Sequence, residues 1–178
     1  MTAVLWQASD GGSELCLLER AGAGWRLRGS VLTHTADLPF EIRYVVTVDA
    51  TWVTTDVGVL VAAAGGEPRE LAELRAVWSA AARPPEYAKC VDVDLGFTPA
   101  TNTLPIRRLG LAVGETAEVE VAWLVWPELE VRPARQSYSR LTENRYLYRQ
   151  GDFEAELAVD QHGLVRQYEG LWRAVAGA

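Results

Sequence analysis

The sequence predicts a mainly β fold in which a long antiparallel sheet curls around a single short α-helix. Apolar and polar residues alternate in short runs along most of the chain, which is the period of strands that bury one face. Gly and Asp residues typical of turns separate these runs at hairpin spacing, which favours antiparallel neighbours. No helices of crossover length alternate with the runs, and this excludes the parallel α/β folds.

Alternation, together with β-branched and aromatic residues, places the strands along the chain. We expect about a dozen strands in total, most of them joined by short turns. The most regular alternation lies in residues 25–31, 40–48, 53–61, 118–123 and 153–159. Turns are predicted at residues 10–12, 22–24, 65–66 and 160–163.

The segment from residue 67 to 85 carries the weakest pattern. Residues 70–78, "ELAELRAVW", have the composition of a helix, but neighbouring strands can impose an extended form on such a segment. We expect a strand here. The sequence Arg83-Pro84-Pro85 then predicts a loop.

The one helix is predicted at residues 104–109. Thr and Asn side chains in residues 98–103 are able to accept hydrogen bonds from its first N–H groups. Pro105 suits a first turn and Gly110 suits the end, so the helix has roughly two turns and a length of about 10 Å. Apolar residues occur on both of its sides, which predicts a helix enclosed by sheet.

Arg107 and Arg108 of this helix need partners if the sheet encloses them, because an unpaired buried charge is costly. Asp92 and Asp94 alternate with apolar residues in the preceding strand, which puts both carboxylates on one face, roughly 7 Å apart. In one interpretation these groups form Arg–Asp pairs that hold the helix in place. In the other, some of them face a cavity and hold a polar ligand.

Composition limits the classes of function. A chain of 178 residues suggests one domain over residues 1–178, and a net charge of −7 argues against nucleic acid and against docking on anionic membranes. No apolar run approaches the roughly 20 residues that span a bilayer, so no stable membrane insertion is expected. The first residues lack the pattern of a signal peptide, and Cys16 and Cys90 stand alone. These observations predict a cytoplasmic protein, and they leave its oligomeric state open.

Catalytic and metal-binding motifs are scarce. His34 and His162 both fall in predicted loops, and the glycines at 22 and 24 precede a strand, whereas a phosphate loop precedes a helix. The sequence therefore predicts no cofactor and no metal site. Asp92 and Asp94 are compatible with acid–base catalysis, which leaves an enzyme of lipid or sugar metabolism as one alternative. A scaffold protein with a filled core is another.

Three long runs resemble one known family: "CVDVDLGFTPATNTLPIRRLGL", "VAWLVWPELEVRPARQSYSRL" and "YRQGDFEAELAVDQHGLVRQYEGLWR". They include the patterns D-x-D-L, P-A-R-Q-x-Y and G-L-V-x-x-Y-x-G-L-W-R. The chain resembles the bacterial family named "Putative glycolipid-binding" over nearly its whole length. This resemblance implies a spiral β-roll, in which an antiparallel sheet winds around one central helix, and it implies lipid binding by analogy of fold.

Taken together, the residues and the resemblance predict a non-catalytic binder of an amphiphilic ligand, such as a glycolipid or a fatty-acyl molecule. The apolar inner faces and some of the seven tryptophans would contact the acyl part. The polar cluster at residues 132–140 is either an exposed strand edge or the mouth of a pocket. The candidate ligand-binding residues are Asp92, Asp94, Asn102, Arg107, Arg108, Arg135 and Tyr138.

Overall fold

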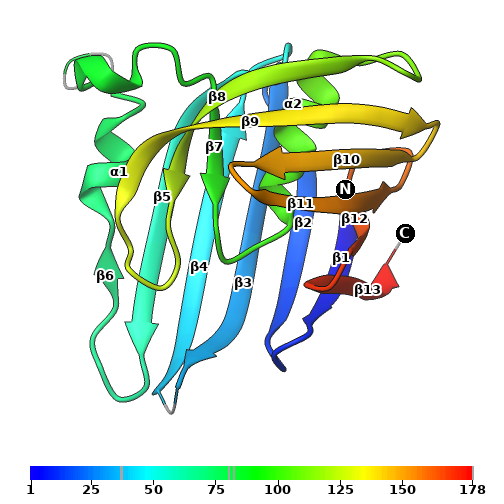
Figure 1. Cartoon of the computed structure of the whole chain (residues 1–178). Coiled ribbons are helices and arrows are strands. Elements are labelled where there is room, and N and C mark those ends of the chain that lie inside the picture. The colour runs from blue at the N-terminus through cyan, green and yellow to red at the C-terminus, as the bar shows by residue number, and fades with distance from the viewer. Residues whose placement is uncertain (37, 80, 82, 178) are drawn as a thin grey trace.

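The computed structural model describes residues 1–36, 38–79, 81 and 83–177. These residues form one curled sheet of thirteen strands (Figure 1). The strands are β1 (Thr2–Ala8), β2 (Ser13–Ala21), β3 (Gly24–Thr35), β4 (Leu38–Val48), β5 (Thr54–Ala63), β6 (Arg69–Glu70), β7 (Asp92–Leu95), β8 (Thr116–Leu124), β9 (Val131–Thr142), β10 (Arg145–Gln150), β11 (Phe153–Val159), β12 (Val165–Tyr168) and β13 (Trp172–Gly177). The predicted mainly β class is confirmed.

The sheet follows the chain outward in both directions from its two terminal strands. Its order is β6-β5-β4-β3-β2-β1-β13-β12-β11-β10-β9-β8-β7, so β1 pairs with β13 in the middle. Neighbouring strands are antiparallel except for β7 and β8, which run parallel. The curl brings β7 back toward β5, where the Thr54 N–H donates to the Val91 carbonyl at 3.3 Å.

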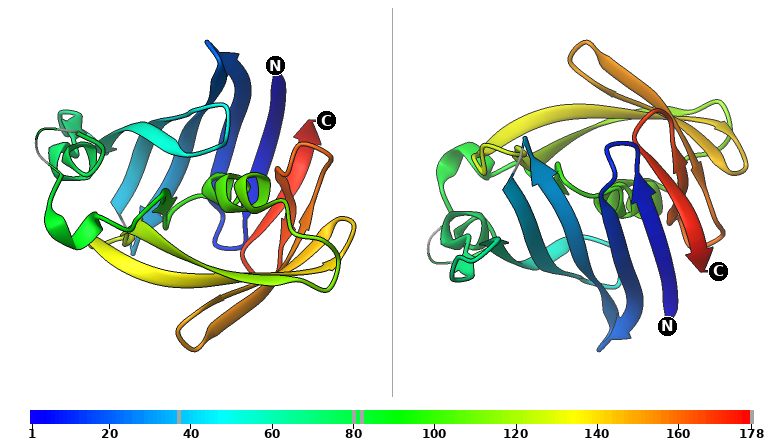
Figure 2. Two further views of the ribbon diagram at one scale, coloured as in Figure 1. Left: turned by 90° about the horizontal axis from the view of Figure 1, so that it is seen from above. Right: turned by 90° about the horizontal axis from the view of Figure 1, so that it is seen from below.

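Helix α2 (Thr103–Leu109) lies inside this curl, between the two parts of the sheet (Figure 2). The 3₁₀ turn η2 (Ala100–Asn102) leads directly into it, and Gly110 ends it in the left-handed conformation with φ of 55°. Thr103, Leu104 and Ile106 are buried. The prediction of a short central helix is confirmed, and the helix begins one residue earlier than expected.

A second short helix, α1 (Ala72–Ala76), occupies the segment for which we expected a strand, so that prediction is wrong. The physical reason is the spacing of the buried side chains: Leu71, Leu74 and Val77 are three residues apart and at most 6% exposed. This spacing suits a helix face, whereas a strand would bury alternate residues. The 3₁₀ turn η1 (Pro85–Tyr87) follows, in the region where the prolines predict a loop.

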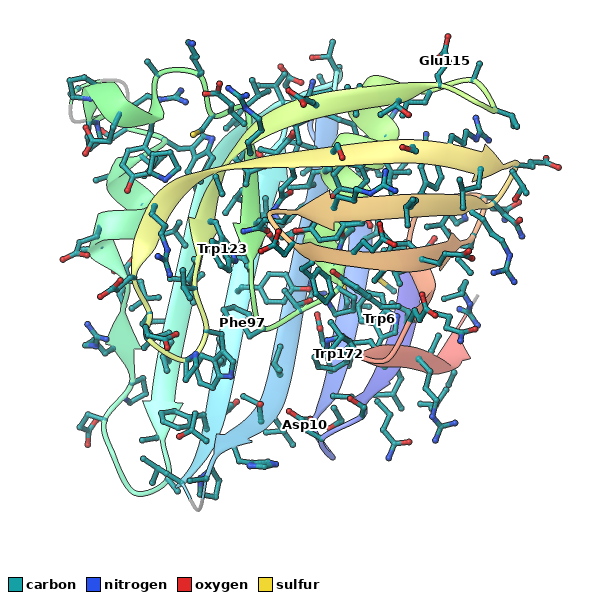
Figure 3. All side chains as sticks on the ribbon, viewed as in Figure 1. Trp6, Asp10, Phe97, Glu115, Trp123 and Trp172 are labelled. Carbon is teal, nitrogen blue, oxygen red and sulfur yellow. The ribbon has the colours of Figure 1, made fainter. Side chains whose placement is uncertain are left out.

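The core lies on the inner face of the curl. Val4, Val31 and Ile42 from the first strands are fully buried, as are Leu104 of α2 and Leu157 of β11. Figure 3 shows Trp6 and Phe97 within the curl, while Glu115 projects from its rim. The alternation in the sequence thus follows from one apolar face of each strand packing against α2 and the opposite part of the sheet.

Two glycines allow close approaches in this architecture. Gly29 of β3 pairs with Tyr44 of β4, and a Cβ atom at Gly29 would overlap the Tyr44 ring. Gly96, just after β7, donates its N–H to the Leu124 carbonyl at 2.9 Å. A Cβ atom at Gly96 would come within 2.9 Å of that carbonyl oxygen and within 3.2 Å of Trp123 Nε1. The second glycine therefore lets the chain turn from β7 toward α2 against β8.

Candidate functional site

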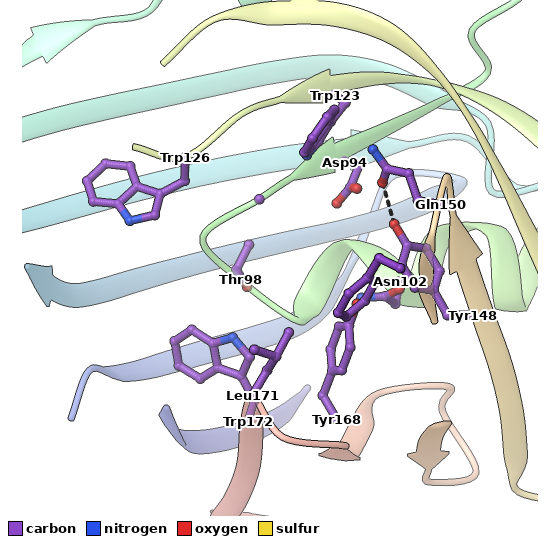
Figure 4. Close-up of a pocket in the computed structure, with 12 residues that line it drawn as sticks. Asp94, Thr98, Asn102, Trp123, Trp126, Tyr148, Gln150, Tyr168, Leu171 and Trp172 are labelled. Atoms are coloured by element: carbon purple, nitrogen blue, oxygen red, sulfur yellow. Dashed lines mark hydrogen bonds between the residues drawn. The ribbon is translucent and has the colours of Figure 1, made fainter. Parts of the chain in front are cut away.

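An aromatic cavity of about 250 Å³ opens beside the start of α2 (Figure 4). We call it the aromatic pocket. Its ring-bearing walls are Trp123, Trp126, Tyr148, Phe153, Tyr168 and Trp172. Its polar lining is Asp94, Thr98, Asn102 and Gln150. The polar groups Asp94 and Gln150 lie together at one end, while Trp126 and Trp172 lie toward the other.

Strands that are distant in sequence supply the walls of this pocket. Asp94 lies on β7 and pairs across the parallel ladder with Trp123 of β8, so both side chains emerge on the same side of the sheet. Tyr148 comes from β10 and Tyr168 from β12. The aromatic pocket is therefore a product of the curl, because only the curl brings the β7 end of the sheet near β12 and β13.

A hydrogen-bond network holds the Asp94 carboxylate. Gln136 Nε2 donates to Asp94 Oδ2 at 2.6 Å, and the Thr101 hydroxyl donates to Oδ1 at 3.2 Å. Gln136 Nε2 also donates to Gln150 Oε1 at 2.9 Å, and the Tyr148 hydroxyl donates to the same oxygen at 2.6 Å. Both Asp94 oxygens thus face donors, and the network leaves the Gln150 Nε2 group available to a ligand.

Burial raises the pKa of Asp94 above its ordinary range, and the hydrogen bonds from Gln136 and Thr101 oppose that shift. Both hydrogen bonds are of the kind that an ionised carboxylate accepts. An amide N–H only donates, and the Thr101 hydroxyl already accepts the Leu95 N–H at 3.2 Å, which orients its proton toward Asp94. The aromatic pocket therefore presents a half-buried hydrogen-bond acceptor.

Asp92 does not line this pocket and is paired with Arg108. Arg108 Nε and Nη2 donate to the two carboxylate oxygens at 3.1 and 2.6 Å, and the Asp92 side chain is fully buried. Burial raises the pKa of Asp92, and the guanidinium partly offsets this. The predicted Arg–Asp pairing is confirmed for these two residues, whereas the partners of Asp94 are Gln136 and Thr101.

Arg107 lines a second cavity at the opposite end of α2. This cavity has a volume of about 630 Å³ and is lined also by Arg140, Tyr146 and Asp160. Arg107 is exposed, its Nη1 lies 3.5 Å from the Gln161 carbonyl oxygen, and its guanidinium lies 5.2 Å from the ring centroid of Trp52. It is thus separated from the aromatic pocket by the length of the helix.

The remaining candidates also lie in separate places. Arg135 is on the outer face of β9, where its side chain is 69% exposed and lies 3.8–3.9 Å from Glu120 and Glu118. Tyr138 is buried, and its hydroxyl donates to Asn102 Oδ1 at 2.9 Å. Asn102 Nδ2 donates to the Pro99 carbonyl at 3.1 Å, and Asn102 makes no side-chain cap on α2, contrary to its expected role. Asn102 instead connects the pocket lining to β9.

Sequence reasoning did not identify which rings form the aromatic walls, and it missed the two glutamines. Tyr146 and Tyr148 alternate on β10, so their common face could be recognised, but nothing local indicates that Tyr148 faces Asp94. The sequence predicts ligand contact for some of the seven tryptophans but does not indicate which ones. Trp6 does lie in the core with 0% exposure, whereas Trp123, Trp126 and Trp172 are half-buried at the pocket.

Across the part of the chain that the structure describes, no group of three or more His, Cys, Asp or Glu side chains is arranged to hold a metal ion. Nor does any helix of residues 1–36, 38–79, 81 and 83–177 have the length and apolar character needed to cross a membrane.

Comparisons with known proteins cover almost the whole chain. The family described as "Putative glycolipid-binding" matches residues 3–174. The structure is similar to the crystal structure of a DUF1089 family protein from Pseudomonas aeruginosa, with a TM-score of 0.75, 33% sequence identity and coverage of 94% of each chain. The curated proteins gave no significant match.

Proposed function

Because the chain belongs to the family described as "Putative glycolipid-binding", we propose that it binds an amphiphilic ligand such as a glycolipid without transforming it. The head group would occupy the aromatic pocket. The observation that supports this most is the combination of six aromatic rings with a cluster of hydrogen-bonding groups at one end of a single cavity. Small-molecule sites have this character, with mostly apolar walls and a few placed polar groups.

The polar end of the aromatic pocket suits a hydroxylated ligand. A sugar hydroxyl both donates and accepts, and it would meet an acceptor at Asp94 and a donor at the Gln150 amide. The neighbouring rings offer flat apolar surface to the C–H faces of a sugar ring. Specificity for a sugar would thus come from the network around Asp94.

The size of the pocket supports a head group and not a whole lipid. Its volume of about 250 Å³ lies just under the range of about 300–1,000 Å³ that encloses drug-sized ligands. Phe153 and Leu171 line the same cavity and are 44% and 41% exposed. The acyl part would therefore extend over this apolar rim.

The enzyme alternative receives less support from the geometry. Glycoside hydrolysis commonly uses two carboxyl groups that flank the scissile bond. Asp94 is the one carboxylate in the described lining of the aromatic pocket, and Asp92 is buried in its pair with Arg108. Binding needs no second carboxylate, which is why we favour it.

The test combines native mass spectrometry with a titration. We expect the purified protein to carry a lipid that organic extraction removes, and the stripped protein to bind octyl β-D-glucoside below its micelle concentration with a change in tryptophan fluorescence. Trp172→Ala should weaken this binding about tenfold or more, a loss of roughly 1.4 kcal/mol.

The matched control is Trp25→Ala. Trp25 is half-buried, as Trp172 is. Its ring stacks on that of Trp52 with the centroids 5.5 Å apart, and it is not part of the aromatic pocket. Equal loss of binding in both variants, or stripped protein that binds no glucoside, would rule the proposal out.

A further inference from the structure

Asp94 has no cationic partner among the residues that the structure describes. Within the ranges that the structure describes, no Lys, Arg or His nitrogen lies within 4.0 Å of its carboxylate, and its partners are the neutral Gln136 and Thr101. The nearby Arg108 does not neutralise the Asp94 carboxylate, because Arg108 is already paired with Asp92. An ionised group in a low-dielectric site without a counterion is costly, so a cation that enters the pocket would be stabilised there.

The aromatic walls of the same cavity suit a cation as well. Trp rings attract ammonium groups over their faces, most strongly where water is excluded. One pocket wall already takes part in such an interaction: the Arg132 guanidinium lies 5.0 Å from the ring centroid of Trp123. Arg132 itself is exposed on β9 and is not part of the pocket lining. Trp123 and Asp94 are paired across β7 and β8, so ring and carboxylate are side by side.

From this juxtaposition we propose that the aromatic pocket selects a head group that carries an ammonium ion, with Asp94 as its counterion and the tryptophan rings as its walls. The inference rests on the proposed function, since it specifies the class of ligand for the same site. The formal charge of −7 agrees with it, because a negative protein attracts cationic ligands at long range. The proposal also agrees with the positions of three arginines that the sequence predicted as ligand-binding residues. Arg107, Arg108 and Arg135 all lie outside this pocket.

Two pairs of matched ligands test the proposal by calorimetry on the stripped protein at about pH 7, where amines are largely protonated. The first pair is choline and its neutral isostere 3,3-dimethylbutan-1-ol. The second is methyl β-D-glucosaminide and methyl β-D-glucoside. We expect the ammonium member of at least one pair to bind tenfold or more tightly than its neutral partner, which corresponds to about 1.4 kcal/mol.

Asp94→Asn should remove this preference, so that the ammonium and neutral members of each pair bind with equal affinity. Glu118→Gln, which changes an exposed carboxylate on the outer face, should leave the preference intact. If Asp94→Asn does not fold, the ratios measured with the unaltered protein still decide the question. Equal binding within both pairs would overturn the ammonium inference and leave the proposed function standing. Failure of all four ligands, together with failure of octyl β-D-glucoside, would overturn both.

Discussion

Glu14 is a carboxyl group enclosed by the first half of the sheet. It is 1% exposed, its Oε1 accepts the Tyr44 hydroxyl at 2.5 Å, and its Oε2 has no hydrogen-bond partner among the described residues. Burial raises the pKa of Glu14 to about 8, although the neighbouring Thr98 and Tyr44 side chains favour the charged form. Glu14 therefore carries a proton in the folded protein at neutral pH.

This protonation predicts a stability that falls as pH rises. The unfolded chain releases the Glu14 proton near its ordinary pKa of 4.5, whereas the folded chain retains it to about 8. Between these values the folded state binds more protons, so the free energy of unfolding should decrease by up to about 1.4 kcal/mol per pH unit. Glu14→Gln should abolish that slope in urea unfolding curves. Glu154→Gln, on an exposed carboxylate, serves as the control, and an unchanged slope in Glu14→Gln would contradict the assignment.

Arg108 should contribute more to stability than any exposed arginine. Arg108→Met leaves the fully buried Asp92 without its partner, at an expected cost of about 3–5 kcal/mol in the free energy of unfolding. The cost should shrink at low pH, because Asp92 can then be buried as a neutral acid. Arg135→Met, which breaks only exposed pairs, should cost about 1 kcal/mol or less. Similar urea midpoints for the two variants would argue against this account.

Single residues show where sequence reasoning reaches its limit. The pairing of Arg108 with Asp92 could be predicted, because an enclosed helix with two arginines needs acidic neighbours and the preceding strand supplies them. The partners of Asp94 could not be predicted in the same way. Gln136 lies 42 residues further along the chain, and its approach depends on the register of β9 against β8.

At the scale of elements, the contact between β3 and β4 depends on a missing side chain. Gly29 lies opposite Tyr44, whose ring fills the space where a Cβ atom would be. Tyr44 also donates to Glu14, so a displaced ring would leave that carboxyl less well satisfied.

Gly29→Ala should therefore destabilise the protein by about 1–3 kcal/mol through overpacking. Gly58 of β5 is a matched control, since no atom lies within 4 Å of a Cβ built there. Gly58→Ala should be neutral or should stabilise by up to about 1 kcal/mol, because the unfolded chain loses conformational freedom. Thermal and urea unfolding of both variants would measure the difference, and equal effects would refute the packing argument.

Strands were the elements that the sequence predicted best. In β3 and β4 the predicted alternation coincides with buried Leu27, Val31, Ile42 and Val46. Helix α1 was missed because it is only about one turn long, too short for its three-residue spacing to stand out from strand alternation. Its Leu74 packs on the core under tertiary constraints that no local pattern contains.

At the scale of the whole molecule, both outer surfaces of the curl mix apolar and charged side chains. The outer face of β1–β5 exposes Leu5, Leu15, Leu32, Val45 and Leu60, and it also carries the Arg28–Glu19 and Arg43–Glu41 ion pairs. The outer face of the second half carries the Arg145–Glu156 and Arg149–Glu154 ion pairs. The alternation in the sequence predicts that each strand has one face in solvent. It does not predict which strands lie side by side on a surface, because that depends on the sheet order.

The β1–β13 pairing determines that order and unites strands at opposite ends of the chain. A disulfide across it should stabilise strongly, because it closes a long loop in the unfolded chain. Gln7 and Arg173 are paired here, 166 residues apart in sequence. Gln7→Cys with Arg173→Cys should stabilise the oxidised protein by about 2 kcal/mol more than Leu5→Cys with Leu15→Cys, which bridges the local β1–β2 hairpin.

The readout for these two disulfides is the urea midpoint of each variant, oxidised and reduced. The native Cys16 and Cys90 are buried and should not interfere. An equal gain from both disulfides would mean that the unfolded chain already keeps its ends close together.

This pairing also explains why the aromatic pocket could be predicted only in part. Asp94 and Asn102 were recognised as candidates because they flank the predicted helix. Trp172 and Tyr168 reach the same cavity only because β13 is fixed against β1, which brings β12 with it. Local periodicity contains no information about such a distant partner.

The same pairing has a consequence for how the protein is made. During translation the first five strands leave the ribosome early and can associate as consecutive hairpins, but the outer edge of β1 stays open until β13 has been synthesised. The newborn chain thus spends most of its synthesis with a strand edge available to other molecules. Chaperone binding to nascent chains should accordingly persist until Trp172–Gly177 has emerged.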